Sequence, residues 1–126
     1  MKYVVIPRKN PQNWSAAPLY YLTTRSLGVV KLEQITNEIA LATSLTRGDV
    51  ANTIQSLLDC IPKYMKMGYS VKLGEFGTYR LTLNSFGSED PEDAKPTKVK
   101  RIGIGFYPST QLRKDIQDTP LEEFPE

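Results

Sequence analysis

Lys98, Lys100 and Arg101 form the densest basic cluster of the chain. Cationic side chains at this spacing suit phosphate contacts, and a solvated, solubilising surface is the alternative interpretation. Alternate residues of a β-strand share a face, so we expect Lys98 and Lys100 to point one way and Arg101 the other. Taken alone, the cluster favours the solubilising surface. The elements that position it must therefore decide between the two interpretations.

Residue types that perform catalysis or bind metals are scarce. The chain has no histidine and one cysteine, Cys60, which excludes an intramolecular disulfide and a multi-cysteine zinc site. The acidic run 89–93 lacks the spacing of a calcium loop and predicts a solvated loop tip. Gly103 and Gly105 are too few for a dinucleotide or phosphate loop. We therefore predict no enzyme, no metal and no cofactor, and expect Cys60 to be a small buried residue.

The charge of the chain is small but uneven. Its 126 residues suit one domain, with 16 Lys and Arg against 14 Asp and Glu and a formal charge of +2. Residues 1–29 contain four basic residues and no acid, whereas residues 114–126 contain one lysine and five acids. This asymmetry is compatible with a polyanionic partner. The apolar run near the N-terminus is too short for a signal peptide or a membrane span, so we expect a soluble, cytoplasmic protein.

Two consecutive helices are predicted in the first half of the chain. Apolar residues recur at helical spacing over residues 31–42. Thr46 is then a candidate N-cap, with the carboxylate of Asp49 three residues later, and an apolar stripe over residues 50–65 predicts a long second helix. Pro62 lies inside this stripe, so we expect a kink or an early end there.

Beyond residue 68 the apolar period changes to two, which predicts a small sheet. The polar segment 85–101 between two alternating runs is typical of a hairpin or a projecting arm, and Ser109 is a candidate N-cap for a last helix. Residues 1–29, rich in proline and aromatic residues, are expected to form an extended arm packed on its own domain or on a dimer partner, with one short strand near residues 4–6; a flexible tail is the alternative. The predicted strands cover residues 71–73, 79–83 and 102–106.

Three separated segments resemble the HU and integration host factor family of bacterial histone-like proteins. Ser44–Asp49 is similar to the joint between the first two helices of that family, and Gly68–Tyr79 to its glycine-rich turn before the DNA-binding arm. Ile104–Ser109 and Leu112–Ile116 resemble the closing strand and helix. The resemblance covers residues 31–117. It implies an α+β fold of two helices, a β-sheet with a projecting β-arm and a final helix, in an intertwined homodimer that binds duplex DNA.

The resemblance also implies a domain organisation and a set of DNA-binding residues. Residues 1–29 would form an N-terminal extension, residues 30–117 the HU-like domain with its arm at about 82–103, and residues 118–126 an acidic tail. The family's Arg-Asn-Pro-x-Thr-Gly arm tip is absent, and the acidic segment Ser88–Asp93 stands near its place. The expected DNA-binding residues are Arg47, Lys72, Arg80, Lys95, Pro96, Lys98, Lys100, Arg101 and Arg113.

The leading interpretation is therefore a homodimeric, histone-like architectural protein of the nucleoid. It would bind and condense double-stranded DNA through phosphate contacts with little sequence specificity. The alternative is an HU-fold dimer that serves as a protein-interaction or scaffolding module, because the arm tip is acidic and the net charge modest. A helix-turn-helix repressor ranks third, because the second helix is long and leads through glycines into a strand. Neither a membrane nor a small-molecule substrate is expected as a partner.

Overall fold

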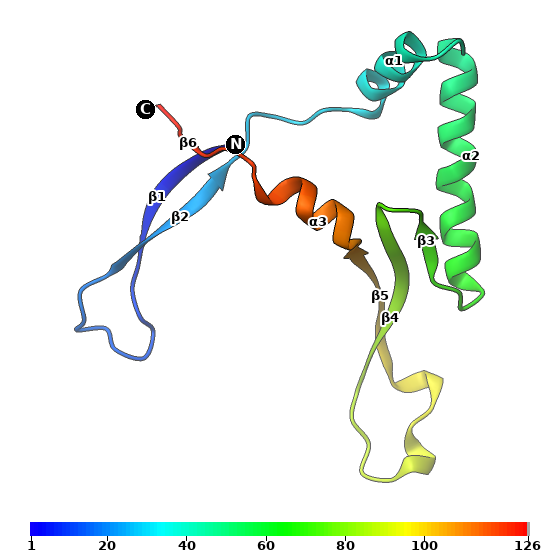
Figure 1. Cartoon of the computed structure of the whole chain (residues 1–126). Coiled ribbons are helices and arrows are strands. Elements are labelled where there is room, and N and C mark those ends of the chain that lie inside the picture. The colour runs from blue at the N-terminus through cyan, green and yellow to red at the C-terminus, as the bar shows by residue number, and fades with distance from the viewer. Residues whose placement is uncertain (126) are drawn as a thin grey trace. The chain divides into compact units, whose positions relative to one another are not determined.

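The computed structural model describes residues 1–125 and divides the chain into two compact units (Figure 1). Unit 1 comprises Met1–Ile35 together with the C-terminal segment that begins at Asp118. Unit 2 comprises Thr36–Gln117. Within the described residues, no helix is both long and apolar enough to cross a membrane.

The helices and the larger sheet follow one another in the predicted order. Helices α1 and α2 precede an antiparallel sheet in which β4 lies between β3 and β5, and α3 follows directly after β5. Two short 3-10 turns, Pro91–Asp93 and Pro96–Lys98, interrupt the β4–β5 connection. The elements are α1 (Leu32–Ala42), α2 (Arg47–Lys66), β3 (Val71–Leu73), β4 (Gly77–Ser85), β5 (Val99–Pro108) and α3 (Thr110–Gln117).

Helix α2 begins where its cap was predicted. The Thr46 hydroxyl accepts a hydrogen bond from the Asp49 N–H at 3.2 Å, and Asp49 places a carboxylate in the first turn. The helix runs through Pro62 to Lys66, so the expectation of an early end is wrong. A proline withholds only its own N–H, and later donors complete the last turn, including the Gly68 N–H to the Met65 carbonyl at 2.9 Å.

The turn between β3 and β4 holds the start of α3. The Ser109 N–H donates to the Phe76 carbonyl at 3.0 Å, and the Ser109 hydroxyl donates to the Glu75 carbonyl. The same hydroxyl accepts the Leu112 N–H at 3.0 Å, which confirms Ser109 as the helix cap. Gly77 is the first residue of β4, and a Cβ added there would lie 2.5 Å from the ring of Phe106. Close packing at this corner therefore requires a glycine.

The core of unit 2 is small in a single chain. Among the described residues, Val50 and Met65 are the buried hydrophobic side chains, and Thr36 is a buried polar one. On the α2 stripe, Leu57 and Leu58 remain 46% and 45% exposed. Cys60 is exposed as well, so its predicted burial is wrong for the single chain. The reason is that α2 packs on β3 and β4, which leaves the rest of its surface uncovered.

Unit 1 is built on a β-hairpin that the sequence only partly predicted. Strands β1 (Lys2–Arg8) and β2 (Leu19–Arg25) pair antiparallel over their whole length, from Lys2 opposite Arg25 to Arg8 opposite Leu19. The short strand β6 (Glu122–Glu123) pairs parallel to β1, giving the order β2-β1-β6. The expected short strand at residues 4–6 is therefore the middle of a longer one.

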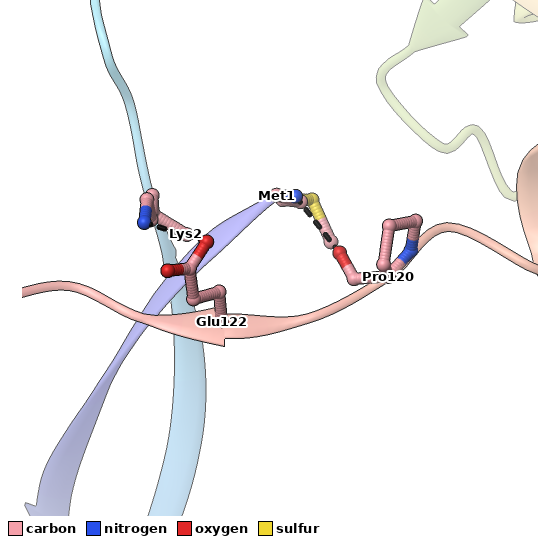
Figure 2. Close-up of polar contacts among 4 residues, drawn as sticks. All are labelled: Met1, Lys2, Pro120 and Glu122. Carbon is pink, nitrogen blue, oxygen red and sulfur yellow. Dashed lines mark hydrogen bonds and ion pairs between the residues drawn. The ribbon is translucent and has the colours of Figure 1, made fainter.

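Polar contacts at the chain ends attach the C-terminal segment to β1 (Figure 2). The amino group of Met1 donates to the Pro120 carbonyl at 2.8 Å, and Lys2 Nζ lies 2.8 Å from the Glu122 carboxylate. The hydrogen bond and the positive charge of Lys2 lower the pKa of Glu122 from its ordinary value. The acidic segment is thus paired with a basic strand at one end of the β1–β2 hairpin.

Candidate nucleic-acid interface

The sheet of unit 2 has one apolar and one polar face. Its register places Arg80 opposite Gly105 and Asn84 opposite Arg101, and Lys72 beside Thr78. Because alternate strand residues share a face, these side chains all lie on the same side of the sheet. We call this side the polar face. It consists of Lys72, Thr78, Arg80, Thr82, Asn84, Arg101, Gly103, Gly105 and Tyr107.

The opposite face carries the apolar side chains of the same strands. Tyr79 and Phe106 stack there with ring centroids 4.7 Å apart, and Phe76 lies 5.5 Å from Phe106. Leu81 and Ile104 continue this face toward the β4–β5 loop. Since the apolar side chains are confined to one side, Lys72, Arg80 and Arg101 are gathered on the other.

Arg80 is held in place on the polar face by Tyr107. Its Nη2 donates to the Tyr107 hydroxyl at 2.9 Å, and the guanidinium carbon lies 4.5 Å from the ring centroid. A Cβ at Gly105 would lie 2.9 Å from the same ring, so this glycine makes room for Tyr107. Arg80 nevertheless stays exposed. A guanidinium has five N–H donors, so most remain for an oxygen acceptor such as a phosphate.

The basic cluster does not alternate along one regular strand, because the β4–β5 register is broken there. The pairing shifts between Asn84 and Ser85, and Lys100 falls at this bulge with its Nζ 4.6 Å from the Phe86 ring centroid. Lys98 ends a 3-10 turn instead of belonging to β5. The expectation that Lys98 and Lys100 share a strand face is therefore wrong, because Pro96 starts a turn that removes Lys98 from the strand.

The β4–β5 loop separates its basic residues from its acidic ones. Lys95 and Pro96 begin the second 3-10 turn, whereas the carboxylate of Asp90 caps the first turn by accepting the Glu92 N–H at 3.2 Å. Pro96 also lines a cavity of about 560 Å³ beside the apolar end of the hairpin. Its other lining residues are Leu83, Ser85, Phe86, Ala94, Lys95, Lys98, Val99 and Ile102.

The remaining two candidates lie on helices. Arg47 is the first residue of α2, and Arg113 lies in α3. Every basic candidate is exposed, and the one ion pair within residues 1–125 joins Lys2 to Glu122. None of these candidates is therefore neutralised by an acidic side chain in the described part of the chain. Their role in DNA binding stays a prediction.

Sequence reasoning missed the aromatic partners of these cations. Tyr107 orients Arg80, and Phe86 lies under Lys100. The alternation of β5 indicates the Arg80–Tyr107 contact in part. Tyr107 follows Gly105 by two residues and therefore shares its face, and Gly105 lies opposite Arg80. The contact between Lys100 and Phe86 depends on the bulge, which no local sequence pattern predicts.

Two helices, a three-stranded antiparallel sheet with one basic polar face, and a closing helix define an HU-like α+β domain. The chain belongs to the HU-HIG family, described as an HU domain fused to a wHTH, Ig or glycine-rich motif, whose model matches residues 1–123. The resemblance to HU proteins is thereby confirmed.

A solved structure shares the fold at low sequence identity. It is the crystal structure of a protein from Bacteroides vulgatus ATCC 8482, provisionally described as a bacterial DNA-binding protein. The TM-score is 0.66 at 17% identity, over 99% of this chain and 48% of the other. The present chain thus spans about half the length of that protein. A comparison with curated proteins gives no match.

Proposed function

We propose that this chain is a histone-like architectural protein that binds double-stranded DNA mainly through phosphate contacts. The observation that carries the proposal is the polar face, where Lys72, Arg80 and Arg101 are exposed on one side of a sheet without acidic partners in the described chain. Family membership and the description of the structural neighbour support it. The DNA-binding domain is residues 30–117, with an arm at about 82–103.

Little sequence specificity is expected of such a surface. Lysine and arginine contacts to phosphates fix the position of a protein on the duplex without reading bases. The glycines at 103 and 105 add no side chain that could read bases, and the space above them is taken by Thr82 and by the ring of Tyr107. The protein would therefore bind many sequences with similar affinity, as expected for a nucleoid protein that condenses DNA.

A homodimer is the proposed binding form, because one chain leaves too much apolar surface uncovered. The chain exposes 10948 Å², whereas a compact protein of 14.2 kDa would expose about 6,800 Å² and two compact halves about 8,200 Å². On α1, Leu32, Ile35 and Ile39 are also more than a third exposed. A second copy that intertwines with the first would cover these stripes and would present two arms to the DNA.

Charge along the proposed arm indicates where DNA contacts it. The tip carries Glu89, Asp90, Glu92 and Asp93, which repel phosphates, while Lys100 and Arg101 lie nearer the sheet. Contact is therefore expected at the base of the arm and on the polar face. Strong bending by a proline at the tip is not part of the proposal, because Pro91 stands among these acids.

Binding of a random duplex over a series of salt concentrations tests the proposal. The expected result is affinity that falls linearly with the logarithm of the salt concentration, because each phosphate contact releases condensed counterions. The alternative, a scaffolding module, is favoured by the acidic tip and predicts no such binding. If the chain does not bind the duplex at low salt, DNA binding is rejected and the scaffolding module remains as the proposed function.

A further inference from the structure

The loop of the β1–β2 hairpin forms a pocket that the proposed duplex contacts do not use. Its volume is about 570 Å³, within the range of small-molecule sites. Arg8 and Lys9 bring two cations to it, and the ring of Tyr21 forms part of its wall. The remaining lining is Asn10, Pro11, Ala16, Ala17 and Leu19. The pocket therefore combines two positive charges with an apolar and aromatic lining.

The two ends of this hairpin differ in charge. At one end Lys2 is paired with Glu122 (Figure 2), and strand β6 brings a second acid, Glu123. At the loop end no lining residue of the pocket is acidic, and residues 1–29 contain no Asp or Glu at all. Arg8 and Lys9 therefore present an uncompensated positive charge, which attracts an anion.

One aromatic side chain, Tyr21, lines the pocket with these cations, and two further exposed rings belong to the same hairpin. Trp14, within the loop, is 72% exposed, and Tyr20 and Tyr21 on β2 are 70% and 47% exposed. The Arg8 guanidinium carbon lies 6.0 Å from the Tyr21 ring centroid, which places it at the pocket wall. Exposed rings next to cations are the combination that binds single strands, since cations hold the backbone while rings stack on bases.

We propose that the β1–β2 loop pocket, with Arg8, Lys9 and Tyr21, is a binding site for single-stranded nucleic acid. Duplex DNA offers phosphates but no free base, because its bases are stacked inside the helix and cannot reach a ring in a pocket. An unpaired nucleotide offers both a phosphate and an exposed base. An acidic peptide would use the cations but gain little from the exposed rings. The site shares no residue with the polar face of unit 2, so the proposal does not depend on duplex binding.

The fluorescence of Trp14 gives a direct test, because it is the one tryptophan of the chain and lies in this loop. We expect oligo(dT) of about eight nucleotides to quench it on binding the full chain. An abasic oligonucleotide of the same length should bind about tenfold more weakly, because stacking is lost. Equal affinity for the abasic strand, or equally effective competition by poly-glutamate, would overturn the proposal.

Paired variants locate the site. Arg8→Gln with Lys9→Gln should flatten the salt dependence of oligo(dT) binding by about 0.7 for each lost phosphate contact. Lys63→Gln with Lys66→Gln makes the same charge change on α2 and should leave that slope unchanged. Tyr21→Leu should weaken oligo(dT) binding about tenfold, whereas Tyr3→Leu, at the other end of the hairpin, should not.

Failure of this proposal is distinguishable from failure of duplex binding. If the wild-type chain binds duplex but not oligo(dT), or if the Arg8 and Lys9 variant binds oligo(dT) as the wild type does, the pocket is not a single-strand site. If the wild-type chain instead binds oligo(dT) but not duplex, the polar face is rejected as a duplex-binding surface. We expect the Arg8 and Lys9 variant to keep its duplex affinity within about twofold.

Discussion

The β1–β2 and β4–β5 hairpins place their acidic residues at opposite ends. In β4–β5 the acids occupy the loop, at residues 89–93, and Arg80 and Arg101 lie on the paired strands. In β1–β2 the acids lie at the base, on β6, where Lys2 pairs with Glu122, and Arg8 and Lys9 lie beside the loop. A net charge of +2 conceals this difference. The position of carboxylates, more than net charge, determines which part of a hairpin can approach phosphates.

The largest effect is expected on the apolar stripe of α2, which the proposed second copy of the chain would cover. Leu57→Asp with Leu58→Asp would place two carboxylates on the α2 stripe, and burying them would cost several kcal/mol. We expect loss of the dimer together with loss of helical circular dichroism. Leu41→Asp is the matched control, because Leu41 is 90% exposed and lies off the α1 stripe. A folded monomer of the wild type, or a folded dimer of the double variant by light scattering, would contradict the dimer.

The next effect concerns the corner from which the β4–β5 hairpin starts. Gly77→Ala would place a methyl group 2.5 Å from a Phe106 ring carbon and 2.7 Å from the Tyr107 carbonyl oxygen. We expect the free energy of unfolding to fall by about 1–3 kcal/mol, the usual cost of overpacking. Gly87→Ala is the control, because no atom lies within 4 Å of its added Cβ. Urea denaturation showing equal stability of the two variants would refute the close packing.

The acidic tip gives a smaller effect of opposite sign. Replacing Glu89, Asp90, Glu92 and Asp93 by their amides should tighten duplex binding by about threefold to tenfold at low salt, because each charge about 10 Å from a phosphate contributes about 0.4 kcal/mol before screening. The gain should shrink as salt is added. Fluorescence anisotropy on one random duplex measures it. Unchanged affinity at low salt would mean that the tip lies far from the DNA.

The smallest effect concerns the base of the β1–β2 hairpin. Because Lys2 lowers the pKa of Glu122, pairing of the C-terminal segment gains stability from this ion pair above the ordinary pKa of 4.5. That stability is lost as the pH falls through the lowered value. NMR titration should therefore give Glu122 a midpoint below 4.5, and Lys2→Gln should raise the midpoint toward 4.5. Identical midpoints in the two proteins would show that the ion pair does not form in solution.

Local signals predicted most of unit 2. The Thr46 and Ser109 caps and the change of period after residue 68 are set by neighbouring residues, and all three appear in the structure. The predictions failed where distant segments decide the outcome. The exposure of Cys60 depends on what packs on α2, and the position of Lys98 depends on a turn and a bulge between paired strands.

Unit 1 was harder to predict for the same reason. Strand β2 has no alternation, since Leu19, Tyr20, Tyr21 and Leu22 form a continuous apolar run. Its partner, β1, also pairs with β6, more than a hundred residues away in sequence. For the candidate interface in unit 2, the sequence indicated the basic residues. Their grouping on one polar face could be recognised only from the β3–β4–β5 register.

The salt dependence of duplex binding in one variant tests the central claim most directly. Lys98→Gln, Lys100→Gln and Arg101→Gln together should flatten the slope of log affinity against log salt by about 0.9 per lost contact, or about 5 for two arms. Lys63→Gln, Lys66→Gln and Lys114→Gln remove the same charge from the helices α2 and α3 and should leave the slope near that of the wild type. If the first triple variant keeps the wild-type slope, the base of the β4–β5 hairpin does not bind DNA.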